Sequence, residues 1–138
     1  MPLRCPNGWT YISGRCYYYV SAKLNWAEAE VNCLTMNANL ASVHSSSEYR
    51  SIQRVITKGS KVSGRTWIGG TDCQIEGIWL WSDGTAFDYR HCGVFDNRHS
   101  KQHCALMNYG DNKCWDDEKC SEEFPSVCAT NRYFPWRG

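Results

Sequence analysis

The sequence predicts an α+β domain of two helices and several short strands, crosslinked by disulfides. Hydrophobic residues recur at helical spacing in two stretches of the first half, 25–37 and 45–58. Beyond Arg65 this period is lost, and short apolar runs bounded by Gly, Asp, Asn and Pro replace it. Nine cysteines in 138 residues favour an oxidising compartment, where thiols pair, over the reducing cytosol. The protein is therefore expected to be secreted and extracellular.

The chain begins with a predicted hairpin. Residues 5–9 and 16–20 have the composition of two strands, and Ser13-Gly14 supplies turn residues between them. A crosslink between Cys5 and Cys16 would fit such a hairpin.

Two helices are expected next, each with a sequence signal at its start. Asn25 and Glu28 have the spacing of a capping box, and Ser45 and Glu48 repeat it. The apolar stripe of the first helix, which ends near residue 37, consists of Trp26, Ala29, Cys33 and Met36. That of the second helix consists of Ile52, Val55 and Ile56, and it fades at Lys58-Gly59.

The second half is predicted to hold short strands around one long loop. The strand-like runs are 66–69, 78–81, 104–107, 113–116 and 126–129, which we expect to form small antiparallel sheets. Residues 82–103 are long and irregular, and a segment of that kind in a compact domain is usually functional. The tail, 130–138, either docks on the body through its aromatic residues or forms a flexible end.

Composition limits the classes of partner. The chain has 15 Lys and Arg against 14 Asp and Glu, a net charge of +1, and no basic block. Nucleic acids and anionic membranes attract clustered positive charge, so neither is an expected partner. Apolar runs stay far below the roughly 20 residues of a membrane-spanning helix. The length suits a single domain over 1–138, with a core at 5–129 and a short tail.

The sequence carries no local catalytic motif. A Gly-x-Ser-x-Gly elbow is absent, and Gly69-Gly70 lacks the Lys-Ser/Thr that completes a phosphate-binding loop. We therefore predict a binding protein rather than an enzyme, although a catalytic triad assembled only in space would escape this test.

The order of several landmarks resembles the C-type lectin-like domain over residues 5–129. These landmarks are the early Cys33, the run Trp67-Ile68-Gly69-Gly70, and the segment containing Cys104, Cys114-Trp115-Asp116-Asp117, Cys120 and Cys128. The resemblance implies two disulfides, Cys33–Cys128 and Cys104–Cys120. It also implies Cys5–Cys16 as a frequent N-terminal bridge, and Cys92–Cys114 as in several fish lectin-like domains.

Cys73 is left over, and its context resembles the type II fish antifreeze proteins. In that group a cysteine follows Trp-Ile-Gly-Gly as Cys73 does, and its partner immediately precedes the equivalent of Cys104. Here that position is His103. Cys73 is thus expected to be a buried free thiol in a monomeric protein. The alternatives are a dimer linked through Cys73 and a rearranged disulfide framework.

The resemblance also identifies the candidate site, and the sequence departs from it there. Calcium-dependent lectins of this class carry Glu-Pro-Asn or Gln-Pro-Asp in the long loop, where this chain has Phe-Asp-Asn at 95–97. Gln102 replaces a glutamate, while Asp116 and Asp117 retain oxygen ligands of the kind calcium prefers. No metal or cofactor is therefore expected, apart from weak calcium binding. The ligands of such a weak site would be Asn97, Gln102, Asp116 and Asp117.

Two ligands follow from the resemblance. The favoured one is an ice crystal surface, bound without calcium by a flat, relatively apolar face. The alternative is a glycan, galactose-like, or a protein ligand in mucus, serum or venom, with Phe95, Arg98 and His99 offering stacking and hydrogen bonds. The expected contact residues for ice or glycan are Thr85, Phe95, Asn97, Arg98, Gln102, Asp116, Asp117 and Ser121.

Overall fold

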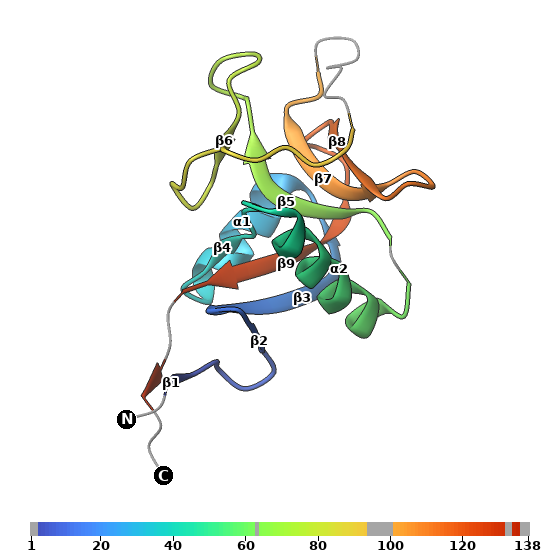
Figure 1. Cartoon of the computed structure of the whole chain (residues 1–138). Helices are drawn as coiled ribbons and strands as arrows, with labels where there is room; N and C mark the ends of the chain where they lie inside the picture. Colours follow the sequence, from blue (N-terminus) through green and yellow to red (C-terminus); the bar gives the residue numbers. More distant parts are fainter. Residues whose placement is uncertain (1–2, 63, 94–100, 132–133, 136–138) are drawn as a thin grey trace.

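The structure, a computed structural model, describes residues 3–62, 64–93, 101–131 and 134–135 and has the predicted α+β fold (Figure 1). Its elements are β1 (Leu3–Arg4), β2 (Thr10–Ile12), β3 (Arg15–Leu24), α1 (Trp26–Thr35), β4 (Asn39–Leu40), α2 (Ser46–Ser60), β5 (Thr66–Thr71), β6 (Leu80–Trp81), β7 (Cys104–Tyr109), β8 (Cys114–Glu118), β9 (Phe124–Thr130) and β10 (Phe134–Pro135). Within these ranges no helix combines the length and the apolar character needed to cross a membrane.

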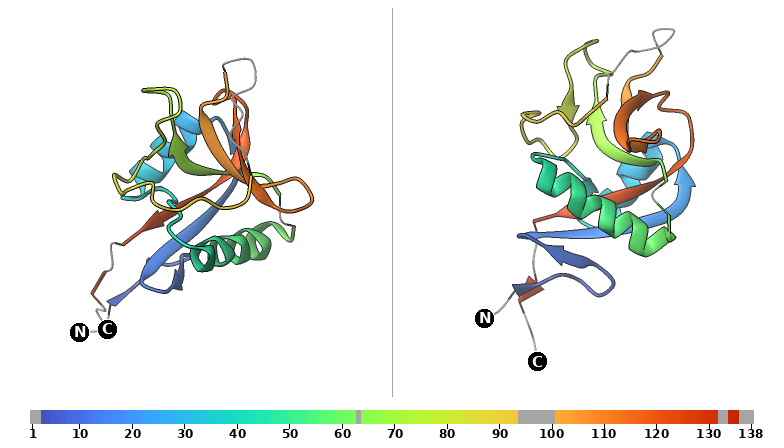
Figure 2. Two further views of the ribbon diagram at one scale, coloured as in Figure 1. Left: turned by 45° about the horizontal axis from the view of Figure 1, so that its top comes forward. Right: turned by 45° about the vertical axis from the view of Figure 1, so that its right-hand side comes forward.

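One mixed sheet organises the molecule, in the order β2-β3-β9-β5-β7-β8, with β4 paired to β9 and β6 to β5. The expectation of small antiparallel sheets is wrong at one pairing, since β5 and β9 run parallel, with Trp67 opposite Ser126. That pairing joins segments more than fifty residues apart, so no local sequence signal could specify it. Figure 2 shows α2 running beside β3, while β5, β7 and β8 lie above them.

Both helices begin at their predicted caps. The Asn25 side chain accepts a hydrogen bond from the Glu28 amide at 2.9 Å, and Glu28 Oε1 accepts one from the Asn25 amide at 3.1 Å, which completes the capping box. At α2 only half of the motif forms. Ser45 accepts from the Glu48 amide at 3.1 Å, but the Glu48 carboxylate accepts from the His44 amide at 2.7 Å.

The N-terminal hairpin lies further along the chain than predicted. Its turn is at Ser13-Gly14, but the first strand is Thr10–Ile12, and residues 5–9 contain a turn in which the Trp9 amide donates to the Pro6 carbonyl at 3.1 Å. The second strand extends to Leu24, because it pairs with β9 as well as with β2. In the tail, β10 pairs with β1 in a separate two-stranded sheet, so that part of the tail is not a loose end.

Among the described residues, the core consists of two hydrophobic clusters. One gathers around α2 and contains Tyr49, Ile52, Ile56, Trp81 and Trp115, among others, while the other lies around α1 and contains Ala29, Cys33, Leu40, Trp67 and Cys128. Two indoles tie the sheet to its surroundings. Trp67 Nε1 donates to the Leu24 carbonyl, and Trp26 Nε1 donates to the Ile68 carbonyl, each at 2.9 Å. The Trp67-Ile68 pair is therefore a packing motif.

Eight of the nine cysteines are paired as the resemblance implied: Cys5–Cys16, Cys33–Cys128, Cys92–Cys114 and Cys104–Cys120. Cys33–Cys128 links residues 95 apart, which in the chain-entropy model stabilises the fold by about 4–5 kcal/mol. Cys73 is the free thiol, but the prediction that it is buried is wrong, since it is exposed. Cys73 lies two residues beyond the end of β5, in an exposed bend outside the sheet.

Candidate functional site

A cavity of about 520 Å³ opens on the β7–β8 hairpin and brings together two of the predicted contact residues, Gln102 and Asp116. Its lining is rich in oxygen and nitrogen atoms and includes three carboxylates and one guanidinium. The lining residues are Arg65, Gly93, Gln102, Tyr109, Gly110, Asp111, Asn112, Cys114, Trp115, Asp116 and Glu118. This set can exchange many hydrogen bonds with a polar ligand. We refer to it as the hairpin cavity.

Strand β8 decides which acidic side chains reach the hairpin cavity. Successive side chains of a strand point to opposite faces, and burial along β8 alternates accordingly. Asp116 and Glu118 are partly exposed and line the cavity, whereas Asp117 is fully buried on the opposite face. Gln102 Nε2 donates to Glu118 Oε1 at 3.4 Å, and the Lys119 amide donates to the same oxygen at 2.9 Å. The expected pair Asp116-Asp117 is thus divided between two faces.

The long loop is fastened to β8 beside the cavity. The Cys92–Cys114 disulfide joins them, and the Trp115 amide donates to the Cys92 carbonyl at 3.1 Å. Phe87 stacks between Trp81 and Trp115, with ring centroids 4.6 and 5.7 Å apart. Aromatic residues of this loop therefore serve to anchor it on the core, and they place Gly93 at the cavity rim.

His91 supplies a second anchor for the same loop. Its ring stacks on Tyr49 with centroids 3.7 Å apart, and Tyr89 Oη lies 2.8 Å from His91 Nδ1. Burial, followed by the positive charge of Arg50, lowers the pKa of His91. Burial also raises the pKa of Tyr49 to about 12, so its hydroxyl stays protonated and donates to the Lys113 carbonyl at 2.7 Å. The hairpin turn is thereby held against α2.

The other predicted contact residues lie elsewhere. Thr85 lines a different cavity, of about 440 Å³, together with Arg15, Ser42, His44 and Asp83. Ser121 is exposed in the turn that follows Cys120 and does not line the hairpin cavity. Phe95, Asn97, Arg98 and His99 fall outside the described residues.

The cavity around Thr85 contains a Ser-His-Asp arrangement. His44 Nε2 lies 3.1 Å from Ser42 Oγ, and His44 Nδ1 lies 2.8 Å from Asp88 Oδ1. However, the Ser42 hydroxyl donates its one proton to Asp83 at 2.5 Å, and Ser42 is only 1% exposed. A nucleophile needs an accessible oxygen whose proton goes to the base. The group is therefore a structural hydrogen-bond network.

Asp83 is the centre of this network. Burial would raise its pKa, but hydrogen bonds from Ser42 and Thr85 and the charge of Arg15 outweigh burial, so the pKa of Asp83 lies below its usual value. The Arg15 guanidinium also donates to the Ser42 carbonyl at 3.0 Å. These contacts connect β3 to the segment after β6.

Possible metal ligands gather at another place among the described residues. Ligand atoms of Asp72, Glu76 and His103 lie within 4.8 Å of one another. Burial opposes ionisation of Asp72, but hydrogen bonds from the Gly77 amide, Glu76 and His103 lower the pKa of this carboxyl. His103 Nδ1 lies 2.9 Å from Asp72 Oδ1, so the cluster is already bonded within the protein.

Sequence reasoning missed Arg65, Tyr109, Asn112 and Glu118 as cavity residues. A signal existed for Glu118, because it stands two positions after Asp116 in a strand and so shares its face. Arg65 precedes β5, and only the pairing of β5 with β7 brings that end of the strand near the hairpin. No sequence pattern marks such a contact.

Comparison with known proteins places this chain in a family. Residues 22–130 match the family described as the Lectin C-type domain, and the chain belongs to it. Proteins of this family are non-enzymatic binding proteins, in agreement with the prediction. The chain is also related to both groups suggested by its sequence, fish type II antifreeze proteins and fish lectins.

Two relatives and two solved structures show the degree of similarity to lectins and to antifreeze proteins. Ladderlectin of Oncorhynchus mykiss is 38% identical over 125 residues, which are 89% of this chain and 66% of that protein, slightly less than two thirds of its length. Galactose-specific lectin nattectin of Thalassophryne nattereri is 38% identical over 129 residues, 92% of this chain and 80% of the relative. A calcium-independent type II antifreeze protein superposes with a TM-score of 0.85 at 37% identity, covering 97% of this chain and 98% of the other. A calcium-dependent type II antifreeze protein in its calcium-free form gives 0.84 at 35% identity, covering 91% and 99%.

Proposed function

We propose that this protein recognises a glycan through the hairpin cavity and does so without calcium. The observation that supports this proposal is the grouping of Gln102, Asp116 and Glu118 with Arg65 in one open cavity. Its volume of about 520 Å³ lies within the range of roughly 300–1,000 Å³ that is usual for small-ligand sites.

The lining suits a polyhydroxylated ligand. Each sugar hydroxyl both donates and accepts a hydrogen bond, so a glycan site needs acceptors and donors together. Asp116 and Glu118 supply carboxylate acceptors, while Arg65 and Asn112 supply donors. Tyr109 is 44% exposed at the cavity, where its ring face can pack against the apolar side of a sugar.

Calcium is not required in this proposal because the described residues of the cavity provide few of the oxygen ligands that this ion needs. Calcium takes six to eight oxygen ligands, among which carboxylates are common. Of the expected ligands, Gln102 and Asp116 line the cavity, Asp117 is buried on the other face, and Asn97 is outside the described residues.

Ice binding is the second candidate, favoured by the similarity to the calcium-independent antifreeze protein. It requires a flat, relatively apolar face, whereas the hairpin cavity is concave and carries the charges of Asp111, Asp116, Glu118 and Arg65. Those groups hold water through strong hydrogen bonds. A surface that binds ice would therefore have to lie outside this cavity.

The proposal treats the chain as one domain over 1–138 that acts outside the cell as a monomer. Four disulfides support the extracellular location, since such bonds persist in oxidising compartments.

Binding measurements on matched variants test the site. We expect galactose or lactose titrated by calorimetry to bind equally well with calcium and with chelator. Glu118→Gln and Asp116→Asn each remove a charged hydrogen-bond acceptor, worth about 1.5–3 kcal/mol, and should weaken binding roughly 10- to 100-fold. Glu122→Gln makes the same chemical change at an exposed position outside the cavity and should leave affinity unchanged.

An ice-shaping and thermal-hysteresis assay on the same samples distinguishes glycan recognition from ice binding. Hysteresis that survives chelation, combined with no glycan binding on an array, would refute glycan recognition and support ice binding.

A further inference from the structure

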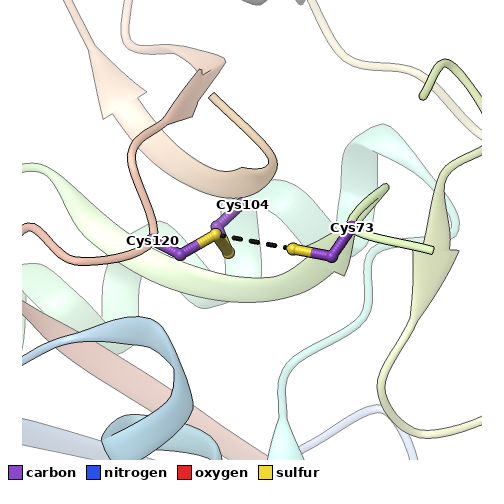
Figure 3. Close-up of side chains that lie close together, drawn as sticks. All are labelled: Cys73, Cys104 and Cys120. Carbon is purple, nitrogen blue, oxygen red and sulfur yellow. Dashed lines mark hydrogen bonds between the residues drawn. A yellow bond between two sulfur atoms is a disulfide. The ribbon is translucent and has the colours of Figure 1, made fainter. Parts of the chain in front are cut away.

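We infer that Cys73 and the Cys104–Cys120 disulfide form a thiol–disulfide exchange centre, in which Cys73 can replace Cys104 as the partner of Cys120. Cys73 Sγ lies 3.8 Å from Cys120 Sγ, and the three sulfur atoms lie within 4.8 Å of one another (Figure 3). This inference concerns a reaction of the scaffold and does not depend on the proposed ligand.

The sheet register explains why three sulfur atoms meet. Cys104 pairs with Thr71 of β5 on one side and with Glu118 of β8 on the other. Cys73 and Cys120 each follow two residues after those partners, so both return to flank Cys104. The cluster is thus produced by strand pairing on both sides of β7.

The environment leaves Cys73 able to react. It is exposed, and the contacts of its sulfur are with Cys120 and with the His103 carbonyl, 3.9 Å away. The side chain of His103 is directed to Asp72 instead, at 2.9 Å. All nine cysteines lie among the described residues, and the other eight are paired with one another. Cys73 can therefore form a disulfide within the chain only by exchange with an existing one.

The exchange balances without any added reagent. Attack at sulfur runs in line with the bond that breaks, so the exposed Cys73 side chain first rotates into line with the Cys104–Cys120 bond. Its thiolate then attacks Cys120 Sγ, a Cys73–Cys120 bond forms, and the Cys104–Cys120 bond breaks. Cys104 leaves as a thiolate and takes up a proton, equal to the one that Cys73 lost. One thiol and one disulfide exist before and after the step.

The product is compatible with the fold. Cys104 is fully buried, and a free cysteine behaves as a small apolar residue that proteins bury readily. The exchanged form therefore leaves no charged group in the core at neutral pH. The covalent tie moves from the β7–β8 hairpin to a link between β8 and the end of β5, close to Gln102 and Glu118.

Peptide mapping of the unreduced protein tests this inference. The full chain is incubated at pH 8.5, where thiolate is more abundant, then quenched in acid, denatured, alkylated and digested under acidic conditions that suppress further exchange. We expect a Cys73–Cys120 peptide to accumulate while alkylation shifts from Cys73 to Cys104. The rate should not depend on protein concentration, and Cys5–Cys16 should remain intact as an internal control.

Two samples without the nucleophile complete the design. Cys73→Ser, and wild-type protein alkylated at Cys73 under native conditions before incubation, should both keep only Cys104–Cys120. Retention of native pairing in the wild type after days at pH 8.5 would overturn the inference. Formation of Cys73-linked dimers alone, at a rate that rises with concentration, would overturn it as well.

Discussion

Replacing Gly93 by alanine should push the backbone of the long loop away from β8, beside the Cys92–Cys114 disulfide that still joins them, and distort the hairpin cavity. Gly93 has φ of +119°, and a Cβ built on it would collide with the Trp115 carbonyl oxygen. The obstacle is backbone, which cannot rotate away as a flexible side chain would. Gly84 provides a matched control, because its φ is +83° and a Cβ there would meet nothing within 4 Å.

The magnitude follows from what each variant loses. Positive-φ strain costs about 1–3 kcal/mol for a non-glycine residue, and both variants experience it. Only Gly93→Ala also forces the loop away from β8, which breaks the hydrogen bond from the Trp115 amide to the Cys92 carbonyl. Leaving such a buried group unsatisfied costs about 1–3 kcal/mol. The difference between the two variants should therefore be about 1–3 kcal/mol, or roughly 3–15 °C in Tm for a domain of this size.

Thermal unfolding monitored by circular dichroism measures both variants, and calorimetric titration with galactose or lactose measures their binding. Gly93→Ala should unfold at the lower temperature and bind more weakly, because Gly93 lines the cavity. Equal Tm values for the two variants, with intact binding in Gly93→Ala, would refute the argument that backbone contact fastens this loop.

Three further outcomes follow from the structure. Millimolar calcium should raise Tm by less than about 1 °C, whereas a site of micromolar affinity would add roughly 4 kcal/mol by mass action; a large shift abolished by Asp116→Asn would contradict calcium-independent binding. The lowered pKa of Asp83 means that its ionised form stabilises the fold at neutral pH, and that this contribution is lost as pH falls through the folded-state pKa. In urea titrations, the difference in unfolding free energy between wild type and Asp83→Asn should therefore be largest near pH 7 and become smaller towards pH 3. A difference that does not change with pH would contradict this role of Asp83. Trp67→Phe should lower the free energy of unfolding by about 2–4 kcal/mol, because it leaves the Leu24 carbonyl without its donor. Trp81→Phe should lower it by less, since Trp81 Nε1 is buried with no hydrogen-bond partner among the described residues. Equal losses of stability in chemical denaturation would show that packing, and not the hydrogen bond, determines the cost.

Local signals predicted the helices well. The Asn25–Glu28 capping box lies within four residues of chain, so its geometry depends on little else. The short strands were harder to place, because their limits depend on partners. β4 escaped prediction since two residues carry no period, and it exists through its pairing with β9.

Some residues of the candidate site were also predictable from local sequence, and others were not. Gln102 and Asp116 were expected from motif positions and do line one cavity, whereas Arg65 and Tyr109 reach it through strand pairing. Thr85 belonged to the predicted set but lies in the network of Asp83 and His44. Proximity along the long loop was a poor guide, because this loop connects β6 to β7 and its described residues Thr85 and Gln102 line different cavities.

The sequence by itself determined the fold class and, through its resemblance to the C-type lectin-like domain, the family and the cysteine pairs, because that resemblance depends on the order of a few landmark residues along the chain. Only the tertiary structure decided that Asp117 is buried while Asp116 and Glu118 face a cavity, since strand register selects the face. It also decided that Cys73 is exposed and 3.8 Å from Cys120. Distances between strands depend on pairings between remote segments, and composition and local spacing do not encode these.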